Sequence, residues 1–217
     1  MKQQKGFTLV EMAIVLVIIG LIMGMAFKGR ELIEGARVKS MAATVNKTQA
    51  AMNTFFERYQ FYPGDGCAAA GATSPANCVG QKNGLLAGGP EVTSFYTLLA
   101  TPAAPANPLL PDTDFQGPFG QRWGVIAGGG ANTAANTTYL AITNIANTTP
   151  SNAVAAAGAP GYGTVDVRYA CALDKMIDDG VPNTGNVRSN AATYNAATVD
   201  CWGLANAQVT LAVRILP

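Results

Sequence analysis

The chain has 217 residues, with 14 basic and 13 acidic side chains and a net charge of +1, so nothing in its composition suggests the clustered basic surface that nucleic-acid binding requires. It contains no histidine, which is the commonest general base and the commonest metal ligand. This excludes a Ser-His-Asp triad, a Cys-His pair and a His-based zinc site, and we expect a protein that is not an enzyme.

An apolar segment begins almost at the N-terminus. Residues 7–27 are long enough to cross a bilayer as a helix, and Glu11 is the only charged residue among them. A charge inside a membrane span costs roughly 2.5–3.5 kcal/mol on insertion scales, so we expect Glu11 to have a functional role. The segment ends at Lys28 without the small-residue cleavage site of an ordinary secretory signal, and we therefore expect a permanent membrane anchor.

Residues 6–11 read Gly-Phe-Thr-Leu-Val-Glu immediately ahead of this apolar helix. The pattern resembles the processing site of type IV prepilins and of the related pseudopilins of type II secretion. The resemblance implies a leader of residues 1–6, which a membrane prepilin peptidase removes by cutting after Gly6, and N-methylation of the new terminal residue, Phe7. It also implies a precursor pool in the bacterial inner membrane and later assembly, by inner-membrane machinery, into an extracellular filament.

Glu11 has a candidate partner in this scheme. It lies four residues after Phe7, on the same helix face and one turn away, and the positive end of the helix dipole favours a carboxylate there. The resemblance implies that Glu11 neutralises the Phe7 amine of a neighbouring subunit in a helical homo-oligomer. Pairing two charges inside an apolar core would favour docking in one register.

A helical pattern continues beyond the span. Side chains recur at spacings of three and four along one stripe, namely Val38, Met41, Val45, Thr48, Met52, Phe55 and Tyr59. We expect one long helix over residues 7–59, whose second half buries Met52, Phe55 and Phe56 against a globular head of residues 60–217. Pro63 and Gly64 should stop it.

Three glycines, Gly20, Gly24 and Gly29, lie in the first half of this helix, which has no proline. Glycine costs about 1 kcal/mol relative to alanine inside a helix, so the three favour local melting during assembly. Close packing between membrane helices is the other interpretation.

The sequence of the head predicts an α+β fold with an antiparallel sheet, and the resemblance implies the same architecture. Segments 122–126, 138–145 and 208–216 have the apolar and β-branched composition of strands, and the last alternates strictly. Residues 91–100 suit a short helix. The intervening segments are rich in Gly, Ala, Asn and Thr and predict surface loops over residues 67–90, 127–137 and 146–163.

The four cysteines are Cys67, Cys78, Cys171 and Cys201, without any Cys-x-x-Cys pair. An even number in a chain with an export-type N-terminus indicates two disulfides, for which three pairings exist. Shorter loops close more readily, which favours Cys67–Cys78 and Cys171–Cys201. Free buried cysteines are the alternative.

Around residue 175 the chain combines a short amphipathic pattern with clustered acids. Residues 169–177 suit a helix, and Asp178-Asp179-Gly180 suits its end, with the glycine in a left-handed cap. The alternative is a calcium site, because Asp174, Asp178 and Asp179 supply hard oxygen ligands. Some pseudopilins bind calcium in this general region, by resemblance only. No other cofactor is expected.

These features together predict a structural subunit of a type IV pilus-like filament. Its alternatives are a minor pilin, a type II secretion pseudopilin, or a binding subunit at the filament tip that acts in adhesion or DNA uptake. The last would need a basic or aromatic surface patch, and the sequence shows no clear one.

Overall fold

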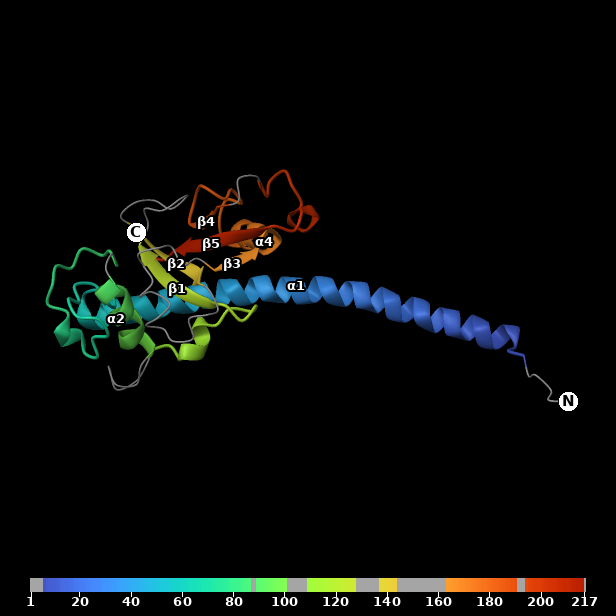
Figure 1. The fold of residues 1–217 in the computed structure, drawn as a ribbon, viewed down its shortest axis with the longest axis horizontal. Helices are drawn as coiled ribbons and strands as arrows, with labels where there is room; N and C mark the ends of the chain where they lie inside the picture. Colours follow the sequence, from blue (N-terminus) through green and yellow to red (C-terminus); the bar gives the residue numbers. More distant parts are fainter. Residues whose placement is uncertain are drawn as a thin grey trace. The chain divides into compact units, whose positions relative to one another are not determined.

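The structure is a computed structural model that describes residues 6–86, 89–100, 109–127, 137–143, 163–190 and 194–216. Helix α1 (Leu9–Tyr59) precedes all other elements (Figure 1). The chain divides into two compact units, Met1–Arg37 and Val38–Pro217, so that α1 contributes to both. The second half of the helix therefore belongs to the same compact unit as the head that follows it.

In the first unit, α1 exposes its apolar side chains. The large apolar residues from Leu9 to Ile33 are all at least 43% exposed. Among the described elements, α1 is the one helix long and apolar enough to cross a membrane. Side chains of this kind leave water only by entering a membrane or packing on further helices.

In the second unit, one face of α1 is buried. The predicted stripe is confirmed, since its members Val38 to Phe55 are at most 5% exposed and Tyr59 is half-buried. The prediction for Phe56 is wrong. Its side chain is 37% exposed and contacts Tyr62, with ring centroids 4.8 Å apart, because a residue next to Phe55 is rotated by about 100° around the helix.

Five strands form an antiparallel sheet around a central strand, β5 (Gln208–Arg214). The outer hairpin is made by β1 (Arg122–Ala127) and β2 (Thr138–Thr143), and β2 pairs with β5. Two short strands, β3 (Thr164–Asp166) and β4 (Val187–Ser189), also pair with β5.

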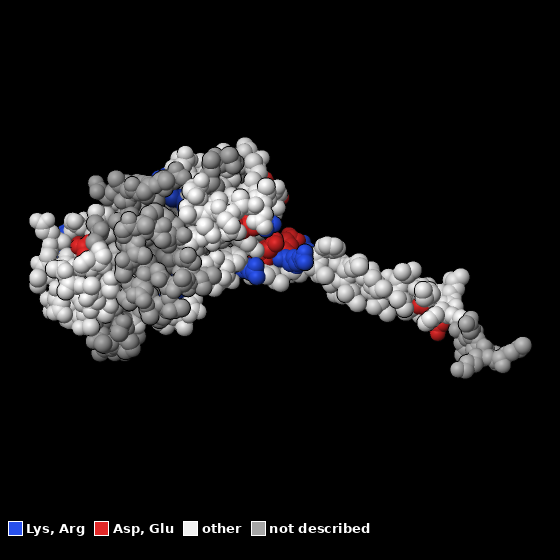
Figure 2. Space-filling view, viewed as in Figure 1, with Lys and Arg blue, Asp and Glu red and all other residues white. Residues whose placement is uncertain are grey.

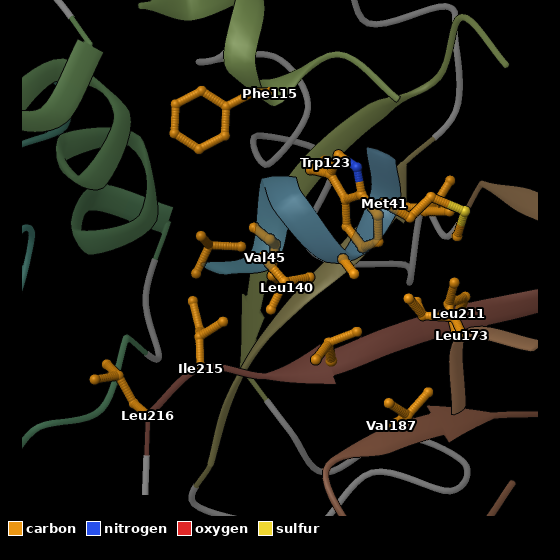
Figure 3. Packing of buried hydrophobic residues seen from close by; sticks show 14 of the residues in the cluster. Met41, Val45, Phe115, Trp123, Leu140, Leu173, Val187, Leu211, Ile215 and Leu216 are labelled. Carbon is orange, nitrogen blue, oxygen red and sulfur yellow. The ribbon is translucent and has the colours of Figure 1, made fainter. Parts of the chain in front are cut away.

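The core lies between the sheet and α1. Figure 3 shows Met41 and Val45 of the helix facing Trp123 and Leu140 of the sheet. All four side chains are at most 2% exposed. The expectation of a long N-terminal helix whose C-terminal half packs on an antiparallel sheet is therefore confirmed.

Helix α2 (Gly89–Ala100) covers the free edge of β1 with one side chain. The Tyr96 hydroxyl accepts a hydrogen bond from Val125 N–H at 2.6 Å and donates one to Trp123 C=O at 3.2 Å. These are backbone groups that an edge strand otherwise leaves unpaired.

Helix α4 (Val167–Ile177) and three single turns complete the described head: η1 (Pro75–Asn77), η2 (Asp112–Phe115) and η3 (Cys201–Gly203). The Asp166 carboxylate accepts a hydrogen bond from Arg168 N–H and caps the N-terminus of α4.

The predicted strands 122–126 and 138–145 correspond to β1 and β2, although residues 144–145 lie outside the described part. The predicted strand 208–216 ends at Arg214. The sequence missed β3 and β4, which have three residues each. Most of the predicted loops 127–137 and 146–163 also lie outside the described residues.

Candidate processing and assembly site

The first turn of α1 is closed by a reciprocal pair of side chains. Thr8 donates to Glu11 Oε2 from both its backbone N–H (2.8 Å) and its hydroxyl (2.9 Å), and Glu11 N–H donates back to Thr8 Oγ1 at 3.3 Å. The first helical bond runs from Met12 N–H to Thr8 C=O at 3.3 Å. This is a capping box, in which a threonine and a glutamate three residues later satisfy each other's free amides.

The cap fixes where the helix begins. Gly6, Phe7 and Thr8 precede it, and the Phe7 side chain is 84% exposed. The peptide bond between Gly6 and Phe7 therefore lies outside the helix, in backbone whose amide and carbonyl are not part of a helical ladder. The sequence prediction began the helix at Phe7 and overlooked the Thr-x-x-Glu signal at residues 8–11 that identifies the true start.

Residues 1–27 match the family model of the prokaryotic N-terminal methylation motif. The chain carries the type IV prepilin signature. Within the prepilin signature lie the capped Glu11 and the non-helical Gly6–Phe7 bond described above. No match was found among curated proteins or among solved structures.

Charged side chains gather directly after the uncharged stretch of the prepilin helix (Figure 2). Lys28 Nζ lies 2.6 Å from Glu31 Oε2, and both side chains are exposed. The first unit thus consists of a capped start, an apolar stretch and a charged end, and charged residues at the end of an apolar stretch are consistent with a membrane anchor.

Both disulfides lie in the second unit and follow the pairing favoured from loop length. Cys67 bonds to Cys78 ahead of α2, and Cys171 on α4 bonds to Cys201 in η3. All four residues are at most 4% exposed. The second bond joins α4 to the segment that leads into β5.

The three predicted calcium ligands come together at the end of α4, within 4.8 Å of one another. Asp174 is fully buried, and its two oxygens accept hydrogen bonds from Gly180 N–H (2.9 Å) and the Tyr194 hydroxyl (3.0 Å). Burial raises the pKa of Asp174 to about 6, and the charges of Asp179 and Asp178 act in the same direction, against these two hydrogen bonds.

The other two acids bind the loop that follows α4. Asp178 Oδ2 accepts hydrogen bonds from Asn186 N–H and from Val187 N–H, the latter at 2.7 Å. Asp179 accepts from Val181 N–H (2.9 Å) and the Thr184 hydroxyl (2.6 Å), and these bonds hold its pKa below the usual value.

This loop also needs its glycines. Gly180 and Gly185 have φ of +76° and +65°, and a Cβ on Gly185 would collide with the Asp178 carboxylate. The cluster thus fastens the loop, and a calcium ion would have to compete with backbone and hydroxyl donors for most of the carboxylate oxygens.

Proposed function

We propose that this pilin-like chain is the structural subunit of a type IV pilus-like filament. The observation that carries the proposal is the prepilin signature on a helix whose apolar side chains are exposed from Leu9 to Ile33. Cleavage after Gly6 and N-methylation of Phe7 release a subunit held in the inner membrane by α1. Docking of this helix on those of other subunits moves it into the filament, with the heads outside.

The capping box suggests how Glu11 is accommodated before assembly. In the precursor, two donors from Thr8 satisfy one carboxylate oxygen, which lowers the cost of placing this charge in an apolar environment. Cleavage creates an ammonium group at Phe7, near the positive end of the helix dipole, where a cation is unfavourable. Glu11 of a neighbouring subunit then neutralises that amine and sets the register of the two helices.

Mass spectrometry of the mature protein tests the processing step. We expect an N-terminus at N-methylated Phe7. A chain that retains Met1 would contradict the proposal and leave an ordinary membrane-anchored protein.

Substitutions of Glu11 test whether assembly needs its charge. Glu11→Gln removes the charge but keeps a residue type that completes a capping box, whereas Glu11→Ala removes both. We expect both variants to be cleaved yet to form no filaments, with Thr8→Ser, which retains a capping hydroxyl, assembling normally. Filaments of Glu11→Gln at wild-type abundance would overturn the proposed pairing.

A minor pilin or a type II secretion pseudopilin is supported by the same signature. Electron microscopy of cells that overexpress the protein distinguishes them. We expect long surface fibres from a major pilin, whereas short periplasmic fibres would assign the chain to secretion.

A further inference from the structure

The segment between Cys78 and α2 carries an asparagine followed by a glycine, Asn83-Gly84, whose backbone is held by a buried acid. Asp65 is 2% exposed. Its Oδ1 accepts a hydrogen bond from Asn83 N–H at 3.2 Å, and its Oδ2 accepts one from Gly84 N–H at 2.9 Å. Asn83 itself is exposed to solvent.

An Asn-Gly pair has an intrinsic reaction. The glycine nitrogen attacks the asparagine Cγ, and the Cγ–Nδ2 bond breaks as the new Cγ–N bond forms. The proton from the glycine nitrogen leaves with the amide group as ammonia. Water then opens the five-membered imide to aspartate or isoaspartate. Glycine permits this because it has no Cβ to obstruct the ring.

Each reacting group at Asn83-Gly84 is held by a hydrogen bond. The attacking nitrogen, Gly84 N, donates to Asp65, and the Oδ1 of Asn83 accepts from Leu85 N–H at 2.9 Å. The surrounding loop is closed by the Cys67–Cys78 disulfide and by a bond from Gly80 N–H to Gly66 C=O of 2.7 Å. Attack would require Gly84 N–H to leave the carboxylate and the Asn83 side chain to release Leu85 N–H.

We propose that Asn83 and Gly84 form a latent deamidation site, which the Asp65 carboxylate keeps unreactive while this loop is closed. Local opening releases the Gly84 amide and starts the reaction. The product adds a carboxylate next to Asp65, and isoaspartate also lengthens the backbone, so the loop cannot close again in the same way. The modification would therefore record irreversibly that a head had opened.

The charges that face Asp65 are those of Glu91 and Lys82. Glu91 accepts a hydrogen bond from Gly66 N–H at 3.1 Å, whereas the Gly84 amide donates to Asp65. Glu91→Gln, on α2, thus removes an acid that contacts the same loop while Asp65 still accepts from the Gly84 amide, and it is the matched control for Asp65→Asn.

The test compares deamidation of the full-length protein in detergent with that of the same protein unfolded in denaturant, at one neutral pH. Peptide mass spectrometry follows the conversion of Asn83, with Asn186 as an internal reference. We expect the native rate to be at least about tenfold lower than the unfolded rate, the factor that breaking one hydrogen bond to a charged group implies. Equal rates, or a faster native rate, would overturn the proposal.

The variants assign the effect to Asp65. In protein that circular dichroism shows to be folded, we expect Asp65→Asn to accelerate conversion of Asn83 while Glu91→Gln retains the wild-type rate. Equal acceleration by both would mean that general loosening of the loop controls the reaction, which contradicts the role of Asp65. If Asp65→Asn does not fold, the comparison of native and unfolded wild-type protein decides.

Discussion

Asp174 places a carboxylate in the core of the head, at the end of α4, where burial raises its pKa to about 6. Because the folded state holds this proton more tightly than the unfolded state, its contribution to stability is present below about pH 4 and is lost as the pH rises through 6. The wild-type protein should therefore lose stability from this group between those values.

Asp174→Asn should abolish that loss. Its amide oxygen can still accept from Gly180 and its NH₂ group can donate to the Tyr194 oxygen, while no charge has to be buried. We expect the free energy of unfolding of the variant to exceed that of the wild type by about 1–3 kcal/mol at neutral pH, and the gain to shrink towards pH 4. Urea titrations across this range measure it. A gain that does not depend on pH would contradict the assignment of the stability loss to Asp174. Glu57→Gln, at an exposed position of α1, is the control.

Gly185 offers a second prediction for a single residue. Alanine there would take φ of +65° and also meet the Asp178 carboxylate, whereas Gly120 has φ of +78° with open space where a Cβ would lie. We expect Gly120→Ala to destabilise the head by about 1 kcal/mol through backbone strain alone. Gly185→Ala should cost roughly 1–3 kcal/mol more because of the collision. Similar midpoints of thermal unfolding for the two variants would show that the contact with Asp178 is not tight.

For single residues, contacts between near neighbours in the sequence could be predicted, whereas contacts between distant residues could not. Thr8 and Glu11 are three residues apart, so their capping box could have been predicted from the motif alone. Tyr194 lies 20 residues after Asp174, and no local pattern links the two. The sequence therefore suggested an acidic turn or a metal site, but it could not indicate that one of the three acids is buried and paired with a tyrosine.

The loop that follows α4 behaves as one element fastened by three carboxylates. Because five of their oxygens already accept hydrogen bonds, we expect millimolar calcium to leave the melting temperature unchanged relative to protein in a chelator. Differential scanning calorimetry measures this. A rise that disappears in Asp179→Asn would instead support the calcium interpretation.

Among the strands, length decides which could be predicted. The patterns for β1, β2 and β5 extend over six or seven residues, enough for β-branched and apolar composition to be recognised. β3 and β4 have three residues each, and they are extended because β5 pairs with them. The exposure of Phe56 was missed for a different reason. Phe55 and Phe56 are adjacent aromatic residues of the same type, and only the rotation of about 100° per residue places one in the core and the other at the surface.

For the whole molecule, the division at Arg37 predicts how the chain tolerates truncation. The described hydrophobic core begins at Val38, and both disulfides lie beyond it. Among the described residues beyond Arg37, the exposed large apolar side chains are those of Phe56, Val79, Met176 and Val199.

A chain that starts at Val38 should therefore be soluble without detergent and should unfold cooperatively. We expect its melting temperature to lie within a few degrees of that of the full chain in detergent, as measured by circular dichroism. Loss of a cooperative transition would show that residues before Val38 contribute to the stability of the head.

The hydrogen bonds of Tyr96 protect a strand edge when many copies of the head are crowded together. Its hydroxyl is hydrogen-bonded to the outward amide of Val125 and the outward carbonyl of Trp123 on β1. On β4, the outward amides of Val187 and Ser189 donate to the Asp178 carboxylate and the Pro182 carbonyl. A strand from another molecule would have to displace these groups before it could pair with β1 or β4. Along β1 and β4, contacts between crowded copies of the head are therefore left to side chains and do not extend the backbone ladder.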